Sequence, residues 1–261
     1  MRLCEPPAGV LQIAGALRQA GVSCRVIDFN QEGLFFQFEQ KPVGDDKWTR
    51  RAADGCREHV EALQHLTGYN DFSTYQRIVG DLQRVLSKQS VREKGWHLGL
   101  ANCEHKQLKA TRSQDLLRCA EQPEENPFYP HFSKRLLVLF NEWTPDIIGI
   151  SLNYLTQALT AFALVGFLRR VIPGATIVFG GGLVTSWLSW PNWYNPFAGL
   201  ADFWISGPGE APLLKIALGN SLAKRDHLRI EEDIDPVMRL PYLAPGLILQ
   251  YSLGSGCFWK R

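Results

Sequence analysis

The second half of the chain alternates short apolar stretches with helical stretches, and this alternation constrains the fold more than any other feature. Apolar residues at helical spacing predict helices over 131–143, 157–171 and 211–219. Short apolar runs predict strands over 146–152, 175–182 and 201–210, the last two running into glycines. Because strands that alternate with helices form parallel sheets covered on both faces, we expect an α/β fold with a doubly wound parallel sheet.

The N-terminal region carries one more piece of the same pattern. Apolar residues at helical spacing predict a helix over 8–21, with Gly21 as its stop, and the β-branched run 24–28 predicts a strand. The region 34–129 breaks the alternation, because it is rich in polar residues and has helical periodicity at 47–66 and 72–88. We therefore expect a mostly helical insertion, ending in the proline-punctuated connection 120–130.

Composition limits the kinds of partner. With 261 residues and 45% hydrophobic content, the chain can bury one sizeable core. The net charge of +2 gives no reason to expect nucleic acid or an anionic membrane as partner. No stretch reaches the roughly 18 consecutive apolar residues of a membrane helix, and the N-terminus lacks a signal-peptide core, so we expect a cytoplasmic protein. Six cysteines without a CxxC pair predict free, mostly buried thiols.

Right-handed crossovers place the carboxyl ends of all the predicted strands at one edge of the sheet, where ligands bind in such folds. Three stretches fall there: a hydroxyl- and amide-bearing loop after 146–152, a run of three glycines, and a Gly-Pro-Gly turn before a helix. Glycines at strand ends also make ordinary tight turns, but three such stretches in register favour a large ligand. The candidate binding residues are Ser151, Asn153, Tyr154, Thr156, Gly180, Gly181, Gly182, Gly207 and Glu210.

Common nucleotide and hydrolase motifs are missing from the sequence. It has no GxGxxG after a predicted strand, no GxxxxGK[ST] phosphate loop and no GxSxG nucleophile elbow. A dinucleotide-binding enzyme, a phosphate-loop enzyme and a serine hydrolase are therefore poorly supported.

The spacing of the edge residues resembles a narrower class. Ser151-Leu152-Asn153 followed after 26 residues by Gly180-Gly181 resembles the serine loop and double glycine of cobalamin-binding domains. Residues 4–30 and 130–261 resemble cobalamin-dependent radical S-adenosylmethionine proteins. The resemblance implies a flavodoxin-like (Rossmann-like) fold, cobalamin as cofactor, and a slot for its nucleotide tail lined by the serine loop and the glycines. It also adds Pro7 of the N-terminal loop to the expected cofactor-binding residues.

The N-terminal loop bears on the lower face of the cofactor. Many cobalamin domains carry an Asp-x-His-x-x-Gly loop whose histidine binds cobalt, and here Pro6 of the sequence CEPPAG stands at the histidine position. The resemblance therefore implies that cobalt lacks a histidine from this loop.

The resemblance also divides the chain into segments. It implies a cobalamin-binding domain over 1–33 and 130–245, a helical insertion over 34–129, and the start of a radical SAM core over 246–261. Family members begin with an apolar central strand, whereas only four residues precede the loop here. Either a start lies upstream or 1–4 forms a stub, and a stub would leave hydrogen bonds of both neighbouring strands unpaired.

Cys257 follows the apolar run 246–252 and resembles the first of the three cysteines that hold the [4Fe–4S] cluster of radical SAM enzymes. The second and third cysteines are absent from this sequence, so we expect Cys257 to be a vestigial ligand. The cluster and S-adenosylmethionine then belong to an intact family member, or to a separate radical SAM polypeptide that acts as partner.

Two features of the insertion allow more than one interpretation. His97, Cys103 and His105 have the spacing of metal ligands, but without a second Cys/His pair we favour polar surface residues. Aromatic residues either pack the insertion on the main domain or cap the upper face of the cofactor. These aromatic residues are Phe35, Phe36, Phe38, Trp48 and Trp96.

The resemblance thus implies a cobalamin-binding module that is not catalytic on its own. The alternatives are a non-catalytic remnant or interaction module without a cofactor, and an enzyme of the same fold that uses another ligand such as a nucleotide. The missing phosphate loop argues against the last alternative.

Overall fold

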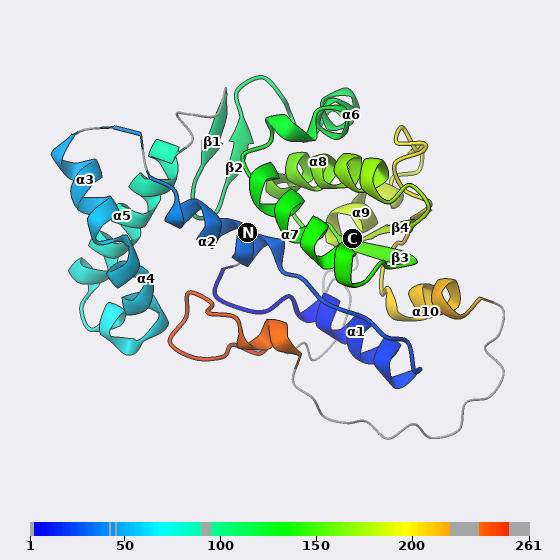
Figure 1. Ribbon diagram of the computed structural model, residues 1–261, viewed down its shortest axis with the longest axis horizontal. Coiled ribbons are helices and arrows are strands. Elements are labelled where there is room, and N and C mark those ends of the chain that lie inside the picture. The colour runs from blue at the N-terminus through cyan, green and yellow to red at the C-terminus, as the bar shows by residue number, and fades with distance from the viewer. Residues whose placement is uncertain (1–2, 42, 45, 90–94, 220–234, 251–261) are drawn as a thin grey trace.

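A computed structural model describes residues 3–41, 43–44, 46–89, 95–219 and 235–250. Its centre is a parallel three-stranded sheet in the order β3 (Ile147–Ser151), β4 (Thr176–Gly180) and β5 (Phe203–Trp204). Helices α7 (Tyr129–Glu142) and α8 (Leu155–Val171) lie over one face, and α1 (Ala8–Gln19) and α10 (Glu210–Leu218) lie over the other (Figure 1). The predicted α/β architecture with a parallel sheet among helices is confirmed.

Buried side chains of β4 and α8 pack together in the core. The three central residues of β4 are buried, and the fully buried Phe162 of α8 packs against Phe179 of β4 with ring centroids 5.6 Å apart. On its other side, α8 packs closely against α6 (Ser113–Glu121). A Cβ at Gly166 of α8 would lie 1.8 Å from the Ala120 carbonyl oxygen, so only glycine permits this approach.

The glycine-rich stretch after β4 differs from its prediction. The predicted strand 175–182 ends at Gly180, and the next helix, α9 (Gly182–Leu188), begins two residues later. Gly181 turns the chain with a φ of 102°, a conformation that favours glycine. The glycines therefore form a strand-to-helix turn, and α9 itself has too short an apolar pattern for sequence prediction.

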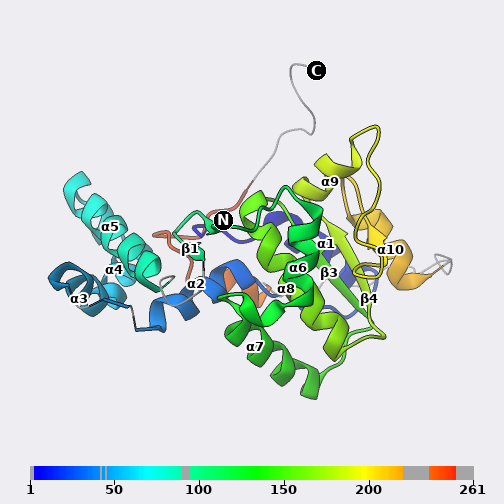
Figure 2. The ribbon, with the colours of Figure 1, turned by 90° about the horizontal axis from the view of Figure 1, so that it is seen from above.

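The insertion is largely helical, as predicted, and most of it forms a separate lobe (Figure 2). The lobe consists of α2 (Phe29–Glu39), α3 (Lys47–Asp54), α4 (Cys56–Gln64), η1 (Leu66–Tyr69) and α5 (Phe72–Gln89). Asp28 caps α2 by accepting hydrogen bonds from the N–H groups of Asn30 and Gln31. Helix α2 therefore crosses the expected boundary at 33–34 and joins the lobe to the sheet domain without a break.

The remainder of the insertion is a β-hairpin followed by helices on the sheet domain. The hairpin pairs β1 (Trp96–Leu98) with β2 (Cys103–His105), and α6 and η2 (Pro123–Glu125) follow. Four of the five aromatic residues named above are at least partly buried, as expected for packing residues. The fifth, Trp48, is 60% exposed, so the packing prediction is wrong there.

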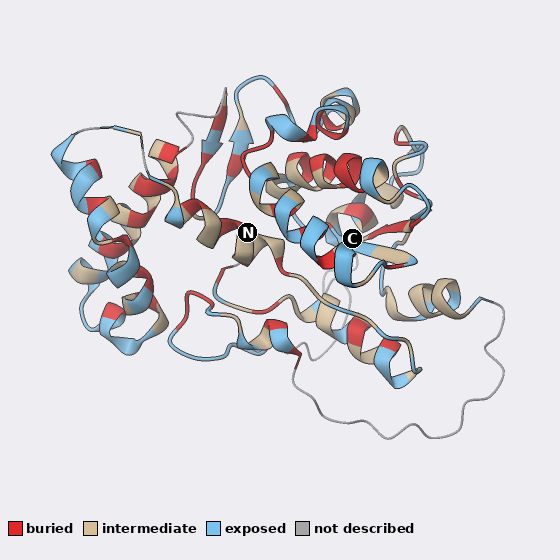
Figure 3. Cartoon of the chain, viewed as in Figure 1, coloured by how far each residue is buried: buried red, intermediate tan, exposed pale blue. Residues whose placement is uncertain are grey.

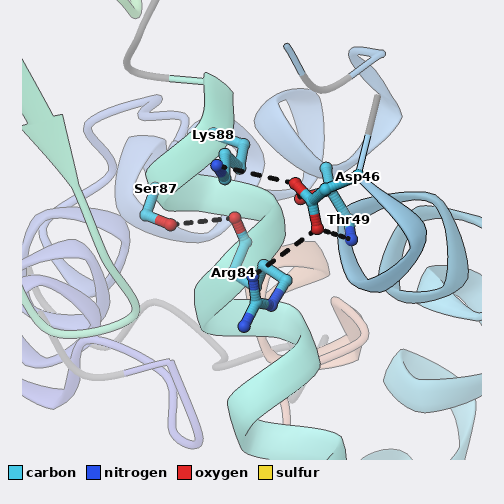
Figure 4. A network of polar contacts seen from close by, with 5 residues as sticks. All are labelled: Asp46, Thr49, Arg84, Ser87 and Lys88. Atoms are coloured by element: carbon cyan, nitrogen blue, oxygen red, sulfur yellow. Dashed lines mark hydrogen bonds and ion pairs between the residues drawn. The ribbon is translucent and has the colours of Figure 1, made fainter. Parts of the chain in front are cut away.

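A charged cluster links α3 to α5 within the lobe (Figure 4). Asp46 caps α3 by accepting hydrogen bonds from the Thr49 N–H and hydroxyl, at 2.9 and 2.6 Å. The same carboxylate lies 3.7 Å from the Lys88 ammonium and 4.0 Å from the Arg84 guanidinium of α5. Hydrogen bonds from Thr49, and then the two cations, lower the pKa of Asp46 to about 2.

The predicted strand 24–28 is not formed. These residues are extended between α1 and α2, but they pair with no strand of the described chain. The reason is the lack of a neighbouring backbone, because β3 has β4 as its one strand partner among the described residues. Leu3 does not enter the sheet either, since its carbonyl oxygen accepts a hydrogen bond from the Leu243 N–H at 2.8 Å.

The C-terminal part of the described chain returns to the N-terminal region. After η3 (Pro236–Arg239), the Tyr242 hydroxyl donates to Asp28 Oδ2 at 3.1 Å. Residues 247–250, at the expected start of a radical SAM core, are exposed and form no strand. Cys257 lies outside the described residues. In the part that the structure describes, no helix is both long enough and apolar enough to cross a membrane.

Burial differs along the sheet (Figure 3). In β4 the central residues are buried, whereas in β3 the isoleucines are half-buried and Gly149 and Ser151 are exposed. A strand inside a parallel sheet is normally buried on both faces. The low burial of β3 therefore marks it as the open edge of this sheet.

Candidate functional site

The predicted edge forms around the carboxyl ends of β3 and β4, and Asn153 joins the two. Asn153 Nδ2 donates to the Ser151 hydroxyl at 3.1 Å, while Asn153 Oδ1 accepts from the Gly182 N–H at 2.9 Å. Ser151 is exposed, as are Asn153 and Gly182. The serine loop and the glycine turn are thus in direct contact at this edge.

Gln157 connects this loop to the first turn of α2. Its Oε1 accepts from the N–H groups of Asn153 and Tyr154, both at 3.1 Å, at the start of α8. Its Nε2 donates to Asn30 Oδ1 at 2.9 Å. Sequence reasoning missed both Asn30 and Gln157, although Asn30 follows an apolar run as the predicted site residues do. Tyr154 is 39% exposed, and within the described residues its side chain forms no hydrogen bond with the other predicted site residues.

The three glycines of the turn differ in how much space each position leaves for a side chain. A Cβ at Gly181 would lie 2.6 Å from the Leu152 carbonyl oxygen, so this glycine is fixed by the fold itself. At Gly180 the nearest atoms would be 4.0 Å away, and at Gly182 3.7 Å away, which are ordinary contacts. Gly180 and Gly182 are therefore the two positions where the missing side chain leaves room at the edge.

The third predicted stretch is tied to the second through Thr185. The Thr185 hydroxyl donates to the Gly181 carbonyl at 3.0 Å and accepts from the Gly207 N–H at 2.9 Å. Gly207 has a φ of 73°, which favours glycine. Glu210 is the first residue of α10 and is half-buried. The structure thus brings all three stretches to one edge.

A cavity of about 290 Å³ opens beside β3, on the side away from β4. Its walls come from β3, α7, α8, residues 25–28 and the first turns of α2. Four of the predicted binding residues lie on it, and the other predicted residues do not. The four are Pro7, Ser151, Asn153 and Thr156. The Thr156 hydroxyl is buried without a hydrogen-bond partner, which is an unusual state that a ligand atom would relieve.

Two carboxylates lie near the cavity, since Asp28 lines it and Glu32 lies beside the lining residue His131. Burial raises the pKa of Asp28, although hydrogen bonds from Gln31, Tyr242 and Asn30 oppose the shift. Glu32 is also partly buried, which raises its pKa, but His131 and Arg135 outweigh this and leave the pKa lowered. His131 lies on the cavity wall, with Nε2 3.4 Å from Glu32 Oε2. Its ring packs against Phe29 and Phe36.

The possible metal ligands of the insertion lie in the β1–β2 hairpin. Cys103 is buried, and burial raises the pKa of its thiol to about 12, which disfavours the thiolate that binds metals. His105 Nδ1 accepts hydrogen bonds from the N–H groups of Gln107 and Leu108. Within the described ranges, no group of three or more His, Cys, Asp or Glu side chains is arranged to hold a metal ion.

The five cysteines that the structure describes are all free. Cys56, Cys103 and Cys119 are buried, and burial raises the pKa of each thiol to about 11, 12 and 12. The prediction of free, mostly buried thiols is confirmed for these residues.

Comparison with protein-family models, with curated proteins and with solved structures finds no match to this chain. The chemistry of the edge must therefore be inferred from its own geometry.

Proposed function

We propose that this chain is a flavodoxin-like cobalamin-binding module that holds the cofactor at the carboxyl edge of its parallel sheet. The observation that carries the proposal is the contact between Asn153, the Ser151 hydroxyl and the Gly182 N–H. It joins the serine loop to the glycine turn, which are the two elements that line the slot for the nucleotide tail in the domains that this sequence resembles. Ligands of parallel α/β sheets bind at this edge.

The side chains at the edge suit a large ligand with an apolar body and few polar groups. Ser151 accepts a hydrogen bond from Asn153, so its own hydroxyl hydrogen is available to a ligand. The buried Thr156 hydroxyl offers a second polar group on an otherwise mostly apolar cavity wall. Gly180 and Gly182 leave space above the strands. These residues would hold the nucleotide tail, while Pro7 would contact the corrin from the N-terminal loop.

The N-terminal loop offers no histidine to the lower face of cobalt. Pro6 stands at the position where related loops carry one, and it is buried. The histidine on the cavity wall, His131, is engaged by Glu32 and by two phenylalanine rings. We therefore propose that cobalamin binds with a weakly ligated lower face, which favours the low-valent cobalt that accepts and donates alkyl groups.

This chain's share of any reaction would be binding and orientation. In the proteins that this sequence resembles, the [4Fe–4S] cluster and S-adenosylmethionine belong to the radical SAM core and not to the cobalamin-binding module.

Titration with hydroxocobalamin tests the proposal. We expect micromolar binding that changes the absorbance spectrum and raises the melting temperature, because a ligand of the folded state stabilises it. A spectrum typical of a nitrogen base on cobalt would contradict the proposed lower face. No response from the folded protein would overturn cobalamin binding itself.

A matched pair of variants locates the site. Gly182→Val adds bulk at the carboxyl edge and should weaken cobalamin binding at least about tenfold by steric overlap. Gly174→Val makes the same change in the turn before β4, at the opposite end of the sheet, where nothing lies within 4 Å of an added Cβ. Gly174→Val should bind as the unchanged protein does. Equal affinity in both variants would show that the slot lies elsewhere.

The interaction module remains a second candidate, and one observation favours it. Strand β3 lies at the open edge of the sheet, and its isoleucines are only half-buried. An edge of this kind is a template for pairing with another chain.

A further inference from the structure

A second hollow, here called the lobe cleft, lies in the helical lobe where α3, α4, η1 and α5 meet (Figure 1). Its volume is about 430 Å³, and none of the residues that line it lines the cavity beside β3. Its charged and polar lining residues are Arg51, Glu58, His59, Thr67, Thr74 and Arg77. A cleft of this size can hold a small ligand, and this lining suits a polar one.

Two arginines from different helices bring unpaired positive charge to the lobe cleft. The side chains of Arg51 in α3 and Arg77 in α5 form no ion pair or hydrogen bond within the described residues. Arg57 of α4, by contrast, donates to Glu61 at 3.0 Å. A guanidinium that lacks a carboxylate partner is available to bind an anion, because its planar fork of N–H donors matches carboxylate and phosphate oxygens.

His59 of α4 presents one edge of its ring to the same cleft. Its Nδ1 lies 3.8 Å from Asp81 Oδ2, and both atoms are buried without a hydrogen-bond partner in the described part of the chain. A Cβ at Gly55, which lines the cleft, would lie 3.2 Å from His59 Cε1 and 3.5 Å from Nε2. With Asp81 beside Nδ1, a second proton on Nε2 makes the ring a donor toward the cleft.

The charges around His59 determine how it responds to an anion. Burial lowers the pKa of His59, and the cations Arg77 and Arg51 lower it further. The carboxylates Asp81 and Glu58 oppose this shift. Both arginines are thus close enough to His59 to act on its protonation. An anion bound between them would reverse their effect, so His59 would gain a proton as the anion binds.

Donors from three helices suit a tetrahedral anion. A carboxylate has two oxygens, whereas the phosphate of a monoester has three outer oxygens, which are enough for Arg51, Arg77 and His59. Glu58 also lines the cleft, and its side chain forms no ion pair or hydrogen bond within the described residues. Its carboxylate repels a bare anion but accepts hydrogen bonds from hydroxyl groups. Glu58 therefore favours a phosphate that is attached to a hydroxyl-bearing body.

We propose that the lobe cleft binds a small phosphate monoester that carries hydroxyl groups, such as the phosphate of a polyol or a sugar. Arg51, Arg77 and His59 hold the phosphate group. Glu58 accepts a hydrogen bond from a hydroxyl of the organic part, and Asp81 positions the His59 ring. The site lies entirely in the helical lobe, so the inference does not depend on whether cobalamin binds at the sheet.

Calorimetric titration of the full chain with three probes tests the ligand class. Glycerophosphate, which is a phosphate monoester with free hydroxyls, should bind saturably with a Kd of about 1 mM or lower. Inorganic phosphate should bind more weakly, because it meets the Glu58 carboxylate without a hydroxyl-bearing body. Glycerol should show no binding, because it has no charge for the arginines to pair with.

A matched pair of arginine variants tests the site. Arg77→Gln removes one cation from the cleft and should weaken glycerophosphate binding at least about tenfold. Arg57→Gln makes the same change on α4 outside the cleft, and it should bind as the unchanged protein does. Both arginines are exposed, so neither change removes core packing, and melting temperatures verify that both variants fold. Glu58→Gln should reduce the preference for glycerophosphate over inorganic phosphate.

An NMR titration follows His59 directly. Glycerophosphate should raise the pKa of His59, because an anion near Nε2 stabilises the imidazolium. A purely structural histidine would keep its pKa when the probe is added.

Four results would overturn the inference. The first is no binding of glycerophosphate to the folded chain, and the second is equal affinity for glycerophosphate in Arg77→Gln and Arg57→Gln. The third is equal affinity for inorganic phosphate and glycerophosphate, which would remove the organic part from the proposed ligand. The fourth is a His59 pKa that stays unchanged when glycerophosphate binds, which would place the phosphate elsewhere.

Discussion

The helical lobe and the parallel sheet of this protein differ in how deeply their residues are buried and in how fully their backbones are paired. In the lobe, Leu82 and Ile78 of α5 are at most 2% exposed, and the charged cluster around Asp46 satisfies the start of α3. In the sheet, β4 is buried but β3 is half-exposed along an edge without a strand partner among the described residues. Helices close their backbone hydrogen bonds internally, whereas a strand depends on its neighbours. A missing neighbour therefore leaves backbone groups unpaired in the sheet, whereas it does not do so in the helical lobe.

The largest expected difference between the two regions is in the free energy of unfolding that is lost when one isoleucine in each is replaced by alanine. Ile78→Ala should lower the free energy of unfolding by about 2–5 kcal/mol, because it opens a cavity in the lobe core. Ile150→Ala in β3 should cost less than half as much, because its side chain is only half-buried. Denaturant unfolding measures both. Equal losses would show that β3 is packed as tightly as the lobe.

Gly166→Ala tests the junction where α6 of the insertion meets α8 of the sheet domain. The added methyl would overlap the Ala120 backbone, and we expect a loss of about 1–3 kcal/mol in the free energy of unfolding. Gly174→Ala is the control, because an added Cβ there meets nothing within 4 Å. Equal melting temperatures for the two variants would contradict the prediction, because they would mean that α6 and α8 move apart at little cost.

Asn153→Ala removes the bridge between the ends of β3 and β4. Loss of its bonds to Ser151 and Gly182 should cost about 1 kcal/mol of folding free energy, and it should also weaken cobalamin binding. Asn141→Ala changes an exposed residue of α7 in the same way and should do neither. Chemical denaturation followed by cobalamin titration of both variants separates the structural effect from the binding effect.

The smallest effect concerns acid stability of the lobe. The pKa of Asp46 is about 2 in the folded chain against 3.8 for an ordinary aspartate, so its folded-state advantage is complete above pH 3.8. That advantage is lost as the pH falls from 3.8 toward 2. Asp46→Asn keeps an N-cap acceptor but has no charge to titrate. Melting temperatures between pH 5 and pH 2 should therefore fall slightly less steeply in the variant, and parallel curves would contradict the prediction.

The candidate site was predictable to the extent that it depends on strand ends. Ser151, Asn153 and Gly180 follow apolar runs, and parallel strands carry such positions to one edge. The roles of Gln157 and Asn30 were not predictable, because they form a bond across 127 positions of sequence. The glycine turn was predicted as a ligand contact, yet Gly181 is required by the approach of Leu152. A glycine pattern alone does not distinguish a ligand from a neighbouring backbone.

The sequence by itself determined where helices form and which apolar runs alternate with them, because helical periodicity and local hydrogen bonding are properties of neighbouring residues. It also predicted that polar groups and glycines would gather at one edge. The tertiary structure alone decided that residues 24–28 remain an unpaired extended segment, that α6 packs on Gly166, and that a cavity lies beside β3. The physical reason is that an extended run becomes a strand only when another backbone lies beside it to complete its hydrogen bonds.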